Sequence, residues 1–135
     1  MDNRIDIKRD LLIFFVLELF FGILAGASFH YIPVRFEAAM VAGTGFLILG
    51  VWLVLKTLRW PGKFNTLTYY LARVHLYIFS LPMLLVRIFY ARIPFDHLHF
   101  VGIPGPVYHR AAEVAYMLLM IATVIDWLRL KIAAK

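Results

Sequence analysis

Residues 68–92 read TYYLARVHLYIFSLPMLLVRIFYAR, a run that is long and apolar enough to cross a lipid bilayer. Three basic side chains interrupt it, Arg73, His75 and Arg87. An Arg at the centre of a membrane helix costs roughly 2.5 to 3.5 kcal/mol on insertion scales, so other helices must supply partners or the side chain must reach the membrane surface. Pro82 removes a backbone hydrogen bond near the middle and predicts a kink. The stretch therefore predicts a membrane helix that packs inside a bundle.

Three further segments have the length and composition of membrane spans. The chain has 135 residues, of which 63% are hydrophobic, whereas about half the residues of a soluble domain are apolar. Crossing about 30 Å of hydrocarbon takes roughly 20 residues of helix. The expected spans are residues 11–31, 36–56, 68–91 and 108–128. They predict an all-α fold, an antiparallel four-helix bundle that forms a single polytopic membrane domain over residues 1–135.

Basic residues gather at the ends of these spans and account for the net charge of +6. One side of the predicted membrane carries Arg4, Lys8, Arg9, Lys56, Arg59, Lys63, Arg129, Lys131 and Lys135, and the other carries Arg35, Arg92 and Arg110. Cytoplasmic loops carry an excess of Lys and Arg, which predicts both termini in the cytoplasm and a bacterial-type cytoplasmic membrane. The orientation of the spans in the membrane therefore explains the positive charge, and no nucleic-acid partner is expected. The expected partners are the lipid bilayer and other membrane subunits, or further copies of the chain.

Small residues share a stripe with a carboxylate in the first span. Glu18, Gly22 and Gly26 recur every four residues, which places them on one helical face. Such a face lets helix backbones approach closely, so we expect a packing face with Glu18 directed into protein. Ala25-Gly26-Ala27 also resembles a signal-peptide cleavage site, but Glu18 interrupts the apolar run that a signal peptide needs. A retained first helix is the prediction.

Ionisable residues are expected in two layers within the bundle, because each helix rises 1.5 Å per residue and residue number therefore gives depth. The inner layer, toward the termini, contains Glu18, Arg73 and His75, with a predicted ion pair between Glu18 and Arg73. The outer layer contains Arg87, Glu113, Glu37 and Arg110, with a predicted pair between Arg87 and Glu113. Such layers either fix the order of the helices or line a route for a proton, an ion or an anionic ligand.

The outer loop, residues 92–107, is longer than a helical hairpin needs and is rich in aromatic and aliphatic residues. We expect it to lie on the membrane surface or to fold back over the mouth of the bundle. Ligand-type residues gather here and at the nearby helix ends: His30, Asp96, His97, His99 and His109. They raise the prospect of a transition-metal site, although their spacing matches no recognised motif. Haem is the other candidate cofactor, with His30 and His109 at one depth as its axial ligands.

Two function classes remain open. Small-residue faces, short loops and the lack of a soluble domain favour a non-enzymatic accessory or assembly subunit of a membrane complex. The alternative is a ligand-handling membrane protein, either a small oligomeric transporter or a haem- or metal-binding redox protein. Cysteine is absent, which excludes thiolate ligands. We find no nucleophile elbow and no His-Glu-x-x-His motif, so the sequence predicts no enzyme class.

Overall fold

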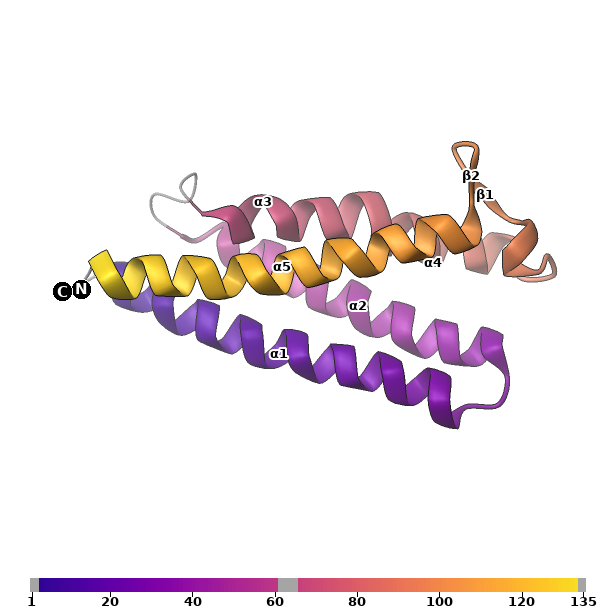
Figure 1. Cartoon of the computed structure of the whole chain (residues 1–135), viewed down its shortest axis with the longest axis horizontal. Helices are drawn as coiled ribbons and strands as arrows, with labels where there is room; N and C mark the ends of the chain where they lie inside the picture. Colours follow the sequence, from indigo (N-terminus) through magenta and orange to yellow (C-terminus); the bar gives the residue numbers. More distant parts are fainter. Residues whose placement is uncertain (1–2, 61–65, 134–135) are drawn as a thin grey trace.

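The computed structural model describes residues 3–60 and 66–133, and its helices form an antiparallel bundle (Figure 1). The helical elements of the bundle are α1 (Asn3–Tyr31), α2 (Arg35–Thr57), α3 (Leu67–Val74), the π-helix η2 (His75–Ser80), α4 (Leu81–Phe89) and α5 (Gly105–Ala133). Because α3, η2 and α4 follow one another without a break, they form one span. The segments long and apolar enough to cross a membrane are Ile7–Tyr31, Arg35–Thr57, Leu67–Phe89 and Gly105–Ile132. The predicted all-α bundle of four membrane-length helices is confirmed.

The two ends of the bundle differ in what they contain. The start of α1 and the end of α5 lie together at one end, here called the terminal end, while the α1–α2 link and the connection into α5 lie at the other, the loop end (Figure 1). Most of the basic residues belong to the terminal end, although Lys63 and Lys135 lie outside the described residues. Which end faces the cytoplasm stays a prediction.

The helices contact one another in a ring. α1 packs on α2 and α5, and the span formed by α3, η2 and α4 also packs on α2 and α5. The link of residues 32–34 between α1 and α2 is so short that these two helices run antiparallel as neighbours. α1 and the third span therefore occupy opposite corners of the bundle, and their residues pack mainly on α2 and α5.

Close packing is concentrated at the terminal end. The ring of Phe14 on α1 stacks on Trp60, with 5.4 Å between ring centroids, and meets Trp52 edge-on at 5.4 Å. Trp60 Nε1 also donates a hydrogen bond of 2.8 Å to Asp10 Oδ2. The buried core at this end comprises Ile7, Leu11, Phe14, Leu49, Leu53, Trp60, Ala72, Tyr116 and Leu119. Toward the loop end α1 and α5 diverge (Figure 1).

A carboxylate from α5 caps the start of α3. Asp126 is only 2% exposed and accepts hydrogen bonds from Thr68 N at 2.7 Å, Thr68 Oγ1 at 2.6 Å and Leu67 N at 3.2 Å. The first amides of a helix have no partner within the helix, and Thr66 at the N-cap position supplies no side-chain cap. Asp126 therefore takes the part that a capping side chain takes elsewhere, and it joins α3 to α5.

A π-helix lies just before Pro82, where the sequence predicts a kink. Pro82 lacks an amide hydrogen, so an α-helical hydrogen bond is lost in this region. Over His75–Ser80 the backbone follows the wider i→i+5 pattern. That spacing brings residues five apart onto one side of the helix, and Ser80 Oγ lies 3.2 Å from His75 Nδ1.

The loop before α5 folds back onto the loop end of the bundle. It contains the 3-10 helix η3 (Phe95–His97) and an antiparallel pair of two-residue strands, β1 (His99–Phe100) and β2 (Ile103–Pro104). Its buried side chains, Leu98 and Phe100, form a cluster with Tyr108, and Phe79, Met83, Val86 and Phe95 pack against this cluster. The tip of the hairpin stands away from the bundle (Figure 1).

Substituting Gly105 with alanine is expected to destabilise this loop. A Cβ at Gly105 would lie 2.5 Å from the backbone oxygen of Phe95, and Gly105 N donates to Leu98 O at 2.8 Å, which holds the two segments together. We expect the free energy of unfolding to fall by about 1 to 3 kcal/mol, as for other overpacked sites. Thermal unfolding in detergent micelles measures it. Gly26→Ala is the control, because its Cβ would meet no atom within 4 Å; equal melting temperatures for the two variants would contradict the close contact.

Candidate functional site

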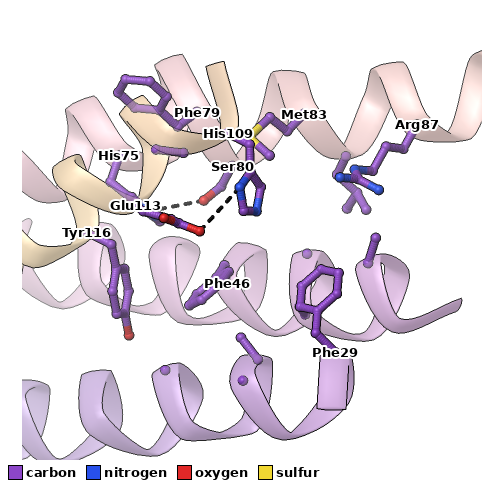
Figure 2. A pocket seen from close by; sticks show the side chains of 18 of the residues that line it. Phe29, Phe46, His75, Phe79, Ser80, Met83, Arg87, His109, Glu113 and Tyr116 are labelled. Carbon is purple, nitrogen blue, oxygen red and sulfur yellow. Dashed lines mark hydrogen bonds and ion pairs between the residues drawn. The ribbon is translucent and has the colours of Figure 1, made fainter. Parts of the chain in front are cut away.

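A cavity of about 410 Å³ lies in the loop-end half of the bundle, lined by residues from all four spans (Figure 2). Its volume is within the 300 to 1,000 Å³ typical of small-molecule sites. Small residues make the room: Gly22, Ala25 and Gly26 on α1, Ala39, Ala42 and Gly43 on α2, and Ala112 on α5. The stripe of Gly22 and Gly26, predicted to be a packing face, therefore lines a hollow over part of its length.

The cavity opens sideways, between α1 and α5. Gly26 and Phe29 on α1, and Glu113 and Met117 on α5, are the exposed residues of its lining, and every other lining residue is buried or partly buried. On the terminal side of this opening, the Tyr116 hydroxyl donates a hydrogen bond to the backbone oxygen of Glu18 and joins the two helices. Both helices are membrane spans, so the opening faces the position of the lipid.

One nitrogen of His75 is available at the inner end of the cavity. His75 is 5% exposed, and its ring lies 5.1 Å from the ring of Tyr116 and 5.9 Å from that of Phe46. Its Nδ1 is 3.2 Å from Ser80 Oγ (Figure 2), and its other ring nitrogen has no hydrogen-bond partner within residues 3–60 and 66–133. His75 therefore brings to the inner end of the lining a ring nitrogen that no described residue engages.

Arg87 lies at the opposite end of the same cavity, beyond His109 and Glu113 (Figure 2). Its guanidinium Cζ lies 4.1 Å from the centroid of the Phe95 ring. The predicted ion pair with Glu113 is not formed, because Glu113 Oε1 lies 3.3 Å from His109 Nδ1 one turn earlier on the same helix. In the described part of the chain, no carboxylate reaches Arg87 within ion-pair distance. The two residues share a cavity without pairing.

The predicted inner pair of Glu18 and Arg73 is not formed either. Glu18 is fully buried and accepts hydrogen bonds from Thr123 Oγ1 at 2.7 and 3.0 Å. Arg73 Nη1 donates to Thr57 Oγ1 at 3.0 Å and to Tyr69 O at 2.8 Å. The physical reason is the order of the helices, which places α1 and the third span at opposite corners. Each polar group finds its partner on the helix beside it.

The histidines do not gather as a ligand set. Asp96, His97 and His99 are exposed on the loop, and His30 is exposed beside Tyr31, so only His109 of the predicted set lines the cavity. Among the described residues, no three histidine, aspartate or glutamate side chains are placed to hold a metal ion. The predicted outer-layer residues Glu37 and Arg110 are also exposed and lie outside the cavity lining.

A haem between His75 and His109 does not fit the depths of these residues. The His75 ring is level with Tyr116, which it contacts, and Tyr116 lies seven residues along α5 from His109. Seven residues of helix span about 10 Å, whereas two axial ligands must meet at one iron. Of the predicted pair of His30 and His109, only His109 lines the cavity, and His30 is exposed. Haem ligation by that pair stays a prediction.

Sequence reasoning missed one residue and one contact of this region. Tyr116 belongs to neither predicted polar layer, although it stands three residues after Glu113 on the same face of α5. The contact between Ser80 and His75 could not be predicted, because only the π-helix brings the two side chains together. No known protein family, characterised protein or solved structure significantly matches the chain.

Proposed function

We propose that this small multi-pass membrane protein binds a membrane-dissolved molecule inside its bundle and receives it sideways from the bilayer. The observation that carries the proposal is the cavity opening between α1 and α5, whose exposed rim residues are Gly26, Phe29, Glu113 and Met117. A molecule entering there moves from lipid into protein without crossing water. The protein is thus a ligand-handling protein, a binder or a small transporter.

Selectivity in such a site comes from the polar ends of the cavity. Lipid tails are as apolar as the cavity wall, so transferring a hydrocarbon body from lipid into the cavity gains little from the hydrophobic effect. Polar contacts discriminate more strongly between one ligand and another, because a buried polar group left without a hydrogen-bond partner costs free energy. His75 and Arg87 are placed to make them at the two ends of the cavity. A ligand with a polar group therefore fits better than a plain hydrocarbon.

The excess of basic residues at the terminal end supports a cytoplasmic position for both termini. In that orientation the cavity lies in the outer half of a cytoplasmic-type membrane. The ligand would then be drawn from the outer leaflet.

A second candidate is the accessory or assembly subunit, and the hairpin of β1 and β2 favours it. Val101 at its tip is fully exposed and has a φ of 53°, which is unfavourable for a β-branched residue. Exposed apolar residues on a protruding and strained tip are a feature of contact surfaces. Another membrane subunit, or a second copy of the chain, is the partner that such a tip would meet.

The binding proposal is tested by extraction of the purified protein. Affinity-purified protein, exchanged into nanodiscs of one synthetic lipid, is extracted with organic solvent and the extract is analysed by mass spectrometry. We expect a lipid-like molecule, other than the nanodisc lipid, in stoichiometric amount. Absorbance and metal analysis of the same sample test for haem and metal. The opposite result is a protein that carries no lipid-like molecule after purification, takes none up, and copurifies with another membrane protein. That result would contradict ligand binding and favour the accessory subunit.

A further inference from the structure

We infer that the ligand is an amphiphile with an anionic head group, a carboxylate or a phosphate, which lies against Arg87 while its hydrocarbon body extends along the cavity toward His75. This inference rests on the proposed binding function and specifies the chemistry of the ligand. It is carried by the surroundings of Arg87, by the position of Arg87 along its helix and by the shape and lining of the cavity.

The guanidinium of Arg87 has an aromatic partner but no anionic one. Its Cζ lies over the Phe95 ring, 4.1 Å from the ring centroid. The donors of a guanidinium point outward within its plane and match the oxygens of a carboxylate or phosphate. Within the described residues no protein group accepts a hydrogen bond from Arg87, and it lines the cavity. An anion that enters the cavity therefore finds these donors available.

The other charges at this end of the cavity do not neutralise Arg87. Glu113 is the acidic residue of the lining, and its carboxylate contacts His109. Arg35, at the start of α2, is close enough to act on Arg87 electrostatically, and it has the same sign of charge. Since an unpaired cation within a membrane span is costly, an anionic head group would stabilise this arrangement.

The position of Arg87 along its helix also suits a head group rather than a tail. α4 ends at Phe89, so Arg87 lies two residues from the end of the span, near the level of the membrane surface. His75 lies twelve residues deeper, which is about 18 Å along the helix. The wall between them is largely apolar, with Phe46, Phe79 and Leu84 among its side chains. A charged head at Arg87 and an extended hydrocarbon body below it follow this gradient of polarity.

Binding of matched probes to the full-length protein tests the inference. The protein in neutral-lipid nanodiscs is titrated with hexadecanoic acid, hexadecyl phosphate and hexadecanol, which share one tail and differ in the head. We expect the two anions to bind about 10- to 100-fold more tightly than the alcohol, the range expected for a hydrogen bond to a charged group. In Arg87→Leu this preference should disappear, and Arg87→Lys should restore part of it. Arg110→Leu is the matched control, because Arg110 lies on α5 near the same end, is exposed and lies outside the lining, so it should keep the full preference.

Each other outcome contradicts a specific part of the account. If all three probes bind equally tightly, the inference that the ligand has an anionic head group is wrong, while the proposed binding function stands. If none of the three binds, the proposed function itself fails. If acetate or inorganic phosphate competes with hexadecanoic acid at equal concentration, the site binds free anions. The inference that the ligand is an amphiphile is then wrong. If Arg87→Leu and Arg110→Leu lose the preference alike, general electrostatic attraction to the basic residues of the loop end explains the preference. In that case the head group is not bound at Arg87. Circular dichroism and melting temperature of Arg87→Leu show whether the variant is folded, and the Lys variant keeps the test decisive if it is not.

Discussion

Replacing Asp126 with alanine is expected to lower the free energy of unfolding by about 3 kcal/mol, because it leaves buried hydrogen-bond donors of α3 without an acceptor. The carboxylate accepts from the amides of Leu67 and Thr68 and from the Thr68 hydroxyl. Asp126 and Thr68 are both almost completely buried, so these donors would be left without their acceptor inside the protein. The start of α3 should therefore separate from α5. Unfolding in mixed micelles with increasing sodium dodecyl sulfate, followed by circular dichroism, measures the loss.

Two control substitutions separate the capping role from a general effect of removing charge. Asp126→Asn keeps one acceptor oxygen, so we expect a loss of about 1 kcal/mol. Asp96→Ala removes the same side chain from an exposed position in η3 and should leave stability unchanged. If Asp126→Ala unfolds at the same detergent fraction as Asp96→Ala, the cap does not hold the two spans together.

Replacing Gly26 with leucine is expected to weaken binding of hexadecanoic acid by about 10-fold or more, the effect of overpacking a site by 1.4 kcal/mol or more. Gly26 lies on the rim of the cavity opening, and a Cβ there would meet no atom within 4 Å. The leucine side chain therefore has space to enter the opening without displacing another helix. Because leucine is also a better helix former than glycine, the melting temperature should stay equal or rise. Loss of binding in a protein of undiminished stability identifies a blocked opening.

Gly26→Ala and Ile23→Phe are the matched controls for this substitution. Alanine adds one methyl group at the same position, so binding should be retained. Ile23 is 70% exposed on α1 and lies outside the cavity lining, so phenylalanine adds bulk on the lipid side only. Binding that is equal in Gly26→Leu and Ile23→Phe would show that the ligand does not pass between α1 and α5.

The membrane bundle could be predicted from the sequence because it depends on properties that act locally along the chain. Length and hydropathy define a span regardless of which helix lies beside it, and the three-residue link between α1 and α2 makes those two helices antiparallel neighbours. Asp126 shows where this reasoning ends. Asp126 lies near the end of the expected span 108–128, and only the packing of α5 on α3 shows that it is a buried cap.

The polar layers could be predicted as sets of residues but not as pairs. Depth along a helix follows from residue number, and Arg87 and Glu113 do line one cavity. Pairing also requires the order of the helices around the bundle and the direction of each side chain. Glu18 and Arg73 are at compatible depths but on helices at opposite corners, so Thr123 and Thr57 become their partners. The cavity itself depends on how far α1 and α5 diverge, which no pattern along one helix encodes.

Photo-crosslinking tests the central claim, a ligand inside the bundle, most directly. Hexadecanoic acid with a diazirine on its tail is added to the protein in bilayers, irradiated, and the labelled residues are mapped by mass spectrometry. We predict labels on Phe79 and Met83, which line the cavity and are largely shielded from lipid, and their suppression by unlabelled hexadecanoic acid. Labels confined to lipid-facing residues such as Ile23 and Ile121, and insensitive to the competitor, would contradict it.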